Sequence, residues 1–355
     1  MHISGNNPPT NQLGSGISEA DVSSAVSRSG YPLQSIVANL IRGQASSRKG
    51  RPFYIQEEWG YVDKDTQDLR TIDILAQEWL YDVESDPERK VRPVLNLVVE
   101  CKQSALPYVF FLSQTRPDVR HFPLIAGLFH EALEIVSDDD PSTWTFDILH
   151  SLGLDSHPFL TTEPEYCTTF AKCIRASGNV ELSGSEPFNG LILPILKAMQ
   201  HFQVIETPPK AALYFDCHAV IGIGVLDAPM IGIRASGQHH VPVLLPWVRA
   251  IRYETDEILD WHRTKRGLSA IDIVHKDFFK DYLCKHLFPF AEVFSGLAAK
   301  HEEELASGKA FAAGFGKDSW LDIEKRLRSR KTGERSKTLV KNLLSLIHRG
   351  KPLQS

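Results

Sequence analysis

The sequence predicts an α/β fold in which helices flank a mixed central β-sheet. Segments typical of helices and of strands intermix along the 355 residues without a strict strand–helix–strand rhythm and without an internal repeat. Leu95, Leu97, Val98 and Val99 form a near-continuous apolar run, which is typical of a strand covered on both faces. The length suits one large domain or two ordinary ones with a substantial core.

The N-terminal region predicts a leader followed by two helices. Residues 1–17 are polar and rich in Gly, Asn and Pro, without the features of a secretory signal, so we expect a disordered leader. Residues 18–43 begin with a Ser/Glu helix-start signal and carry apolar residues at helical spacing. Gly30 and Pro32 interrupt this spacing, which predicts two helical pieces.

The remaining elements follow from composition and periodicity. Aromatic and β-branched content predicts a three-stranded meander over 53–63, 70–80 and 94–102, and a strand or loop over 105–114. Helices are predicted over 121–135, 164–176, 187–203 and 271–294, and strands over 210–235 and 239–254. We expect one domain over 18–296 and a basic helical extension over 297–355.

Two charged residues follow the apolar run of the third strand. Because side chains alternate along a strand, Glu100 and Lys102 must point to the same face. Upstream, Asp73 lies between Ile72 and Ile74 in another predicted strand. If the strands pair, two carboxylates and one ammonium meet, and a divalent cation would offset the repulsion between the acids. Oxygen ligands suit Mg²⁺, and a nearby lysine can orient or help deprotonate an attacking water.

This pattern resembles that of the PD-(D/E)XK nucleases, the restriction-endonuclease-like superfamily. The motif consists of Asp73 and, after a hairpin, Glu100-Cys101-Lys102. Segments 29–43 and 100–111 resemble the first helix and the continuation after the motif in bacterial members, and 220–233 and 271–283 resemble the late strands and closing helix. The resemblance is scattered over about residues 18–295 and implies a restriction-endonuclease-like core.

The resemblance implies a role for each motif residue. Asp73 and Glu100 would bind Mg²⁺, with Mn²⁺ as a substitute, the main-chain carbonyl of Cys101 would add a ligand, and Lys102 would position the water. Many members carry a glutamate on the first helix, where this chain has Gln34. We therefore expect Gln34 to face the metal and to act through hydrogen bonds rather than charge.

The expected activity is metal-dependent hydrolysis of phosphodiester bonds, most readily by an endonuclease acting on DNA, with RNA as an open alternative. The resemblance also suits bacterial restriction or phage defence. A second hypothesis is a catalytically silent member of the fold that binds nucleic acid or a protein partner in a larger assembly; a homo-oligomer also stays open. Gln34 would then mark a decayed site.

Other motifs favour less specific interpretations. Gly222-Ile223-Gly224 lies in an apolar strand-like run without a following helix start, so we interpret it as packing rather than phosphate binding. Five scattered cysteines predict a reducing, cytoplasmic location. No window approaches 18 uninterrupted apolar residues, so no membrane span is expected.

The C-terminal end is strongly basic although the whole chain carries a net charge of −5. Residues 320–355 contain ten Lys or Arg and three acids, with apolar residues at helical spacing over 339–347. We expect an amphipathic helix whose basic face binds DNA. The candidate DNA-contacting residues are Arg326, Arg328, Arg330, Lys331, Arg335 and Lys337.

Overall fold

The computed structural model describes residues 4–312 and 327–328 apart from gaps at 48–51, 83–86, 117–118, 120–121, 138–142, 163, 237–238 and 256–265. The helices are α1 (Glu19–Arg28), α2 (Tyr31–Ser47), α3 (Ile148–Ser151), α4 (Pro158–Thr161), α5 (Ser185–Pro187), α6 (Leu193–Ile205), α7 (Phe279–Asp281), α8 (Phe288–Lys300) and α9 (Glu302–Ser307). Two π-helical turns, η2 (Phe188–Ile192) and η4 (Tyr282–Leu287), and two 3-10 turns, η1 (Leu154–Ser156) and η3 (Lys276–Phe278), lie between helices or at their starts.

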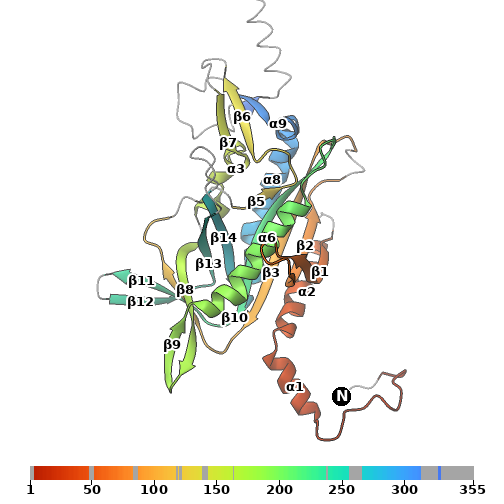
Figure 1. The fold of residues 1–355 in the computed structure, drawn as a ribbon, viewed down its shortest axis with the longest axis vertical. Coiled ribbons are helices and arrows are strands. Elements are labelled where there is room, and N and C mark those ends of the chain that lie inside the picture. The colour runs from red at the N-terminus through yellow and green to blue at the C-terminus, as the bar shows by residue number, and fades with distance from the viewer. Residues whose placement is uncertain are drawn as a thin grey trace, which may run out of the picture.

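Twelve strands of the described residues form one mixed sheet in the order β1-β2-β3-β10-β14-β13-β8-β4-β11-β12, with β5 paired to β10 and β9 to β8. These strands are β1 (Tyr54–Val62), β2 (Leu69–Trp79), β3 (Val91–Gln103), β4 (Tyr108–Leu112), β5 (Leu124–Ala126), β8 (Glu165–Ala176), β9 (Asn179–Ser183), β10 (Phe215–Asp227), β11 (Met230–Ser236), β12 (His239–Leu244), β13 (Trp247–Thr255) and β14 (Arg266–His275). A smaller sheet has the order β16-β15-β6-β7, from β6 (Ala132–Ser137), β7 (Thr143–Asp147), β15 (Lys309–Ala312) and β16 (Leu327–Arg328). The predicted mixed sheet flanked by helices is confirmed (Figure 1).

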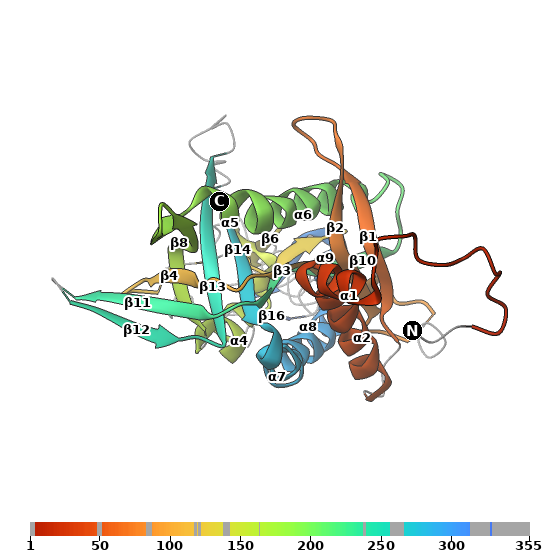
Figure 2. The ribbon, with the colours of Figure 1, turned by 90° about the horizontal axis from the view of Figure 1, so that it is seen from below.

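Helices cover both faces of the large sheet around β3. Helix α6 packs its apolar residues on one face, where they contact Val98 of β3. Helices α2 and α8 cover the other face, where their buried residues belong to the same hydrophobic cluster as Leu97 and Val99. Figure 2 shows α6 on one side of the strands and α2, α7 and α8 on the opposite side. β3 is thus covered on both faces, as its apolar run predicts.

The two predicted N-terminal helices and the predicted strand meander are confirmed. Helices α1 and α2 are separate, and Ser18 caps α1 by accepting a hydrogen bond from the Asp21 N–H. β1, β2 and β3 form the antiparallel meander. Residues 4–17 lie outside helices and strands and are largely exposed.

Two predicted helices are strands instead. Residues 165–176 form β8, where a register shift against β4 sets Phe111 opposite Thr169 but Leu112 opposite Cys167. The bulge makes neighbouring residues bury together, so the buried pairs recur every four residues and imitate a helix. Segment 121–135 contains β5 and the start of β6, separated at Gly127, which has a φ of +84° and whose added Cβ would lie 1.8 Å from the Asp216 carbonyl oxygen.

The helix predicted over 271–294 begins later, and its first residues belong to β14. Ile271 and Ile273 are fully buried in a central strand, and the first helical turn starts at Lys276. The boundary expected at 296/297 falls inside α8, where Ala298 is fully buried. β15 then pairs with β6 in parallel, so residues up to 312 pack as part of the same fold.

A buried ion pair joins β13 and β14 to the helical layer. Arg249 donates two hydrogen bonds to Asp272, with Nε–Oδ1 at 2.7 Å and Nη2–Oδ2 at 2.9 Å. The Tyr282 hydroxyl donates to Asp272 Oδ2 at 2.8 Å, and Arg249 Nη1 donates to the Phe159 carbonyl. Arg249 is 1% exposed and Asp272 is fully buried, so each charge depends on the other.

Candidate functional site

The antiparallel pairing of β2 with β3 brings Asp73 and Glu100 together. The last residues of the ladder in register are Ile74 and Val99, and the next residue on each strand is Asp73 and Glu100. At this point Asp73 Oδ2 accepts the Cys101 N–H at 2.7 Å, so a side-chain carboxylate takes a main-chain donor. The two predicted acids are therefore neighbours.

Lys102 lies on the same face as Glu100, as alternation along a strand predicts. Its ammonium Nζ lies 2.5 Å from Glu100 Oε1. The π-helical turn η2 lies over its stem, because a Cβ added at Gly190 would be 3.8 Å from Lys102 Cε. The lysine is about one third exposed and the glutamate side chain 7% exposed, so the pair opens toward solvent at the ammonium.

Burial sets the protonation of the acids. Burial and, after it, the Asp73 charge raise the Glu100 pKa from its ordinary 4.5 to about 7, although Lys102 opposes the shift. Burial likewise raises the Asp73 pKa, against the Cys101 N–H and Lys102. Burial alone would lower the Lys102 pKa, but the Glu100 carboxylate outweighs it and the net direction is upward. At neutral pH the ammonium is therefore charged and Glu100 lies close to its titration point.

One buried oxygen of the site lacks a partner. Glu100 Oε2 has no hydrogen bond in the part of the chain that the structure describes, although Glu100 is only 6% exposed. Leaving a buried acceptor unpaired costs about 1–3 kcal/mol. A hard cation held by Glu100 and Asp73 would satisfy this oxygen, so the donor set fits Mg²⁺ chemically. Over the described ranges, however, no group of three His, Cys, Asp or Glu side chains is close enough to hold a metal ion.

Cys101 contributes its main chain to the site. Its N–H binds Asp73, while its side chain is buried and burial raises the pKa of the thiol well above its ordinary value. A thiolate ligand is therefore disfavoured. The metal-ligand role expected of the Cys101 carbonyl stays a prediction.

Gln34 reaches the site from α2. It is 6% exposed, and its side-chain Nε2 donates to the main-chain carbonyl of Asp73 at 3.1 Å. The helix thereby fixes the strand at the residue that carries the carboxylate. Gln34 lies beside Asp73 as expected, but its hydrogen bond holds the backbone rather than a carboxylate oxygen.

The sequence interpretation missed Glu58. This exposed residue of β1 has a φ of +53° and lies between the pairs Glu57–Ile74 and Trp59–Ile72, opposite Asp73. After burial and the opposing contacts, its charge is a further cause of the raised Asp73 pKa. The sequence did carry a signal for it, because Glu57 and Glu58 are consecutive residues of a predicted strand. Consecutive side chains point to opposite faces, so one of these two acids must lie on the polar face of the meander.

The glycines of β10 serve packing, as predicted. A Cβ at Gly222 would lie 2.5 Å from Ile195 Cγ2, and one at Gly224 would lie 2.9 Å from Leu191 Cδ1. Their absence lets η2 and α6 approach the strand beside β3. These glycines thus help to place the helical layer over Lys102.

The basic C-terminal residues lie mostly outside the described residues. Arg326, Arg330, Lys331, Arg335 and Lys337 are not described, and Arg328 is described only as part of β16. DNA binding by this segment stays a prediction.

Comparisons of the chain with protein-family models, with curated proteins and with solved structures found no match. In the described residues, none of the helices is both long and apolar enough to cross a membrane.

Proposed function

We propose that this protein is a Mg²⁺-dependent nuclease that hydrolyses phosphodiester bonds, with DNA as its primary substrate. The observation that carries the proposal is the unpaired, buried Oε2 of Glu100 beside the carboxylate of Asp73 and the ammonium of Lys102. A structural role alone does not account for a buried and a half-buried acid side by side with raised pKa values, since an apolar pair would be more stable there.

The order of elements around the site supports a restriction-endonuclease-like core. Helix α2 precedes the β1–β2–β3 meander, and α6 precedes β10, which pairs with β3 in parallel. The acids lie where β2 and β3 separate, and α2 and α6 pack on opposite faces. This arrangement is similar to the one that the sequence resemblance implies.

Each residue would have a separate role in hydrolysis. Asp73 and Glu100 would hold Mg²⁺, which supplies a polarised water and neutralises charge on the phosphate when bound. Lys102, charged at neutral pH, would donate to the attacking water or to a phosphate oxygen. Gln34 would hold Asp73 in place through its main chain, and Mn²⁺ would serve in place of Mg²⁺.

A second candidate is a silent nuclease-fold module that binds nucleic acid or a protein partner. It is favoured by Gln34, whose amide brings no charge to the site, and by the lack of a third carboxylate in ligand range among the described residues. The two candidates predict the same fold and opposite results in a cleavage assay.

The test is incubation of the purified protein with supercoiled plasmid, linear duplex DNA and RNA in Mg²⁺, Mn²⁺ or EDTA. We expect cleavage with either metal, and a loss of about 10²-fold or more in rate for Asp73→Asn, Glu100→Gln and Lys102→Ala. Glu57→Gln is a matched control, because this exposed acid of β1 pairs with Arg42 instead. Cleavage at the wild-type rate by folded Glu100→Gln would refute the site, and no cleavage by the wild type favours the silent module.

A further inference from the structure

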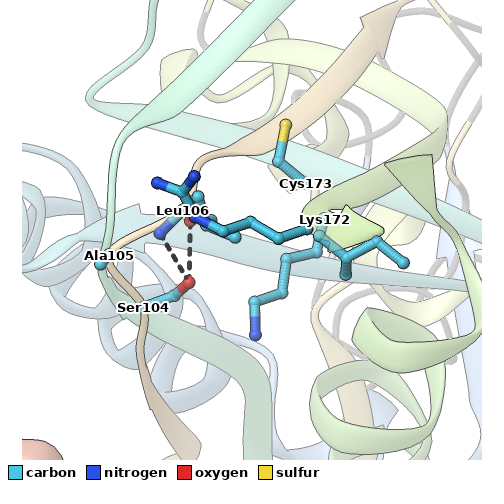
Figure 3. Close-up of a pocket in the computed structure, with 7 residues that line it drawn as sticks. Ser104, Ala105, Leu106, Lys172 and Cys173 are labelled. Carbon is cyan, nitrogen blue, oxygen red and sulfur yellow. Dashed lines mark hydrogen bonds between the residues drawn. The ribbon is translucent and has the colours of Figure 1, made fainter. Parts of the chain in front are cut away.

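Two pockets adjoin the end of β3, beyond the candidate site. The first, of about 450 Å³, lies between residues 104–106, which follow β3, and residues 172–175 of β8 (Figure 3). The second, of about 690 Å³, lies at the ends of β10 and β14. Ser104 and Ala105 line both pockets, so the two adjoin. Both volumes are in the range of small-ligand sites.

The first pocket is basic. Arg175 is exposed and has no ion-pair partner among the described residues. Lys172, three positions earlier on the regularly paired β8, points to the opposite face and pairs with Glu186. The Ser104 hydroxyl is engaged with the Leu106 main chain, which fixes the turn that closes the pocket (Figure 3). A phosphate group matches the guanidinium of Arg175.

The second pocket is apolar with an acidic rim. Its wall includes Ala228, Pro229, Met230 and Leu245, and the half-buried ring of Phe278 also lines it. Asp227, which pairs with Lys276, and Asp277, which lies beside His275, are at its edge, and their remaining carboxylate oxygens accept hydrogen bonds from amino groups. An aromatic or heteroaromatic ring with exocyclic amino groups, such as a nucleobase, fits this surface.

Both pockets lie close to Lys102, both in sequence and through contacts between neighbouring elements. Ser104 follows Lys102 by two residues, or about 7 Å at the rise of an extended strand. Across the chain, Glu186 of α5 pairs with Lys172, and Gly190 in the adjoining η2 lies over the Lys102 stem. A nucleic-acid strand bound with one phosphate at Lys102 would therefore pass its next phosphate to the first pocket.

We propose that these pockets together hold one unpaired nucleotide next to the phosphate at Lys102, with its phosphate at Arg175 and its base in the apolar pocket. This inference rests on the proposed function and names its substrate class: a single strand, or a duplex with unpaired nucleotides. A base stacked in an intact duplex cannot enter the pocket unless it is first extruded, which costs a few kcal/mol.

The test measures binding without cleavage. Fluorescence anisotropy in EDTA compares a labelled single-stranded DNA 12-mer, the RNA of the same sequence, the blunt DNA duplex, and that duplex with an overhang. We expect the single strands and the overhang to bind at least about tenfold more tightly than the blunt duplex, since extrusion costs more than about 1.4 kcal/mol. The RNA arm reports whether the site distinguishes the sugars.

Two variants address the two pockets, and both change exposed residues. Arg175→Ala should weaken single-strand binding and reduce its log–log salt slope by about 0.7, as expected when the protein neutralises one phosphate fewer. Ala105→Phe fills the shared wall and should weaken single-strand binding about tenfold while duplex binding stays unchanged. Arg28→Ala, at an exposed arginine of α1, is the matched control and should bind like the wild type.

The outcomes separate this inference from the proposed function. Equal binding of single strand and blunt duplex by the wild type, or wild-type binding by both Arg175→Ala and Ala105→Phe, would overturn it even if DNA is cleaved in Mg²⁺. A single-strand preference that both variants abolish supports the nucleotide site even if the cleavage assay shows a silent module. Circular dichroism and thermal melting confirm that each variant is folded.

Discussion

Replacing Glu100 with glutamine should remove a large part of the pH dependence of stability in the metal-free protein. Burial holds the Glu100 pKa at about 7 in the folded state, against an ordinary 4.5. Below pH 4.5 the carboxyl is protonated in both states and the folded protein bears no penalty. As the pH rises to 7 the unfolded chain ionises first, so the free energy of unfolding falls, and the loss is complete above pH 7.

The magnitude follows from the same two values. Each pKa unit corresponds to about 1.4 kcal/mol, so the full loss is roughly 3 kcal/mol. Glu100 is 6% exposed, so solvent screens this cost little. Glutamine has almost the same shape and cannot ionise, so the variant should lack this component. At pH 8 its stability relative to the wild type should be about 3 kcal/mol higher than at pH 4, whatever the constant cost of removing the ion pair with Lys102.

The assay is urea denaturation in EDTA between pH 4 and pH 8, with the wild type and Glu100→Gln measured side by side. Titrating groups remote from the site contribute equally to both proteins, so the difference reports Glu100 together with its coupled neighbours Asp73 and Lys102. Glu57→Gln provides the control, because this acid is exposed and should change the pH profile little. Parallel pH profiles for wild type and Glu100→Gln would refute the burial argument and with it the assignment of Glu100 as a desolvated acid.

Further predictions concern the other parts of the site and the fold. Gln34→Glu should lower the Mg²⁺ concentration for half-maximal cleavage, because a carboxylate strengthens a hard-cation site, and should cost about 1 kcal/mol in urea denaturation, because it removes the hydrogen bond to Asp73; an unchanged metal titration would leave Gln34 a purely structural role. Deleting residues 320–355 should weaken DNA binding regardless of sequence. It should also reduce the slope of log affinity against log salt concentration by about 0.9 for each phosphate of duplex DNA that the segment neutralises, whereas an unchanged slope and affinity would favour a protein interface for this segment. Arg249→Met should destabilise the protein by about 3–5 kcal/mol in urea denaturation, because it leaves Asp272 charged and unpaired in the core; a loss below about 1 kcal/mol would contradict this.

The meander and its acids were predictable because they depend on local sequence rules. Alternation along a strand places Glu100 and Lys102 on one face, and consecutive antiparallel strands separated by short polar connections pair with their neighbours. Because Ile72 and Ile74 fix the face on which Asp73 points, the pairing of the two strands then places Asp73 beside Glu100. Both strand register and side-chain direction therefore follow from residues fewer than thirty positions apart.

The rest of the fold depends on pairings between distant segments. The Arg249–Asp272 ion pair could not be predicted, because its other hydrogen-bond partners, Tyr282 and Phe159, lie elsewhere in the chain. Nothing in the sequence around either residue indicates these neighbours. β8 was misassigned because its bulge against β4 breaks the alternation on which strand prediction rests. The pockets beyond Ser104 likewise combine segments from five regions of the chain.

The site lies where the regular pairing of β2 with β3 ends. The Asp73 carboxylate takes the Cys101 N–H, and Gln34 takes the Asp73 carbonyl, so main-chain groups that would extend the ladder are bound by side chains instead. Next to these hydrogen bonds the two acids lie side by side, and one Glu100 oxygen is unpaired among the described residues. Such a site costs stability in the metal-free protein, and a cation that bound to the folded state would offset this cost in proportion to the logarithm of its concentration over its dissociation constant. If nothing bound at this site, apolar residues at positions 73 and 100 would make the protein more stable.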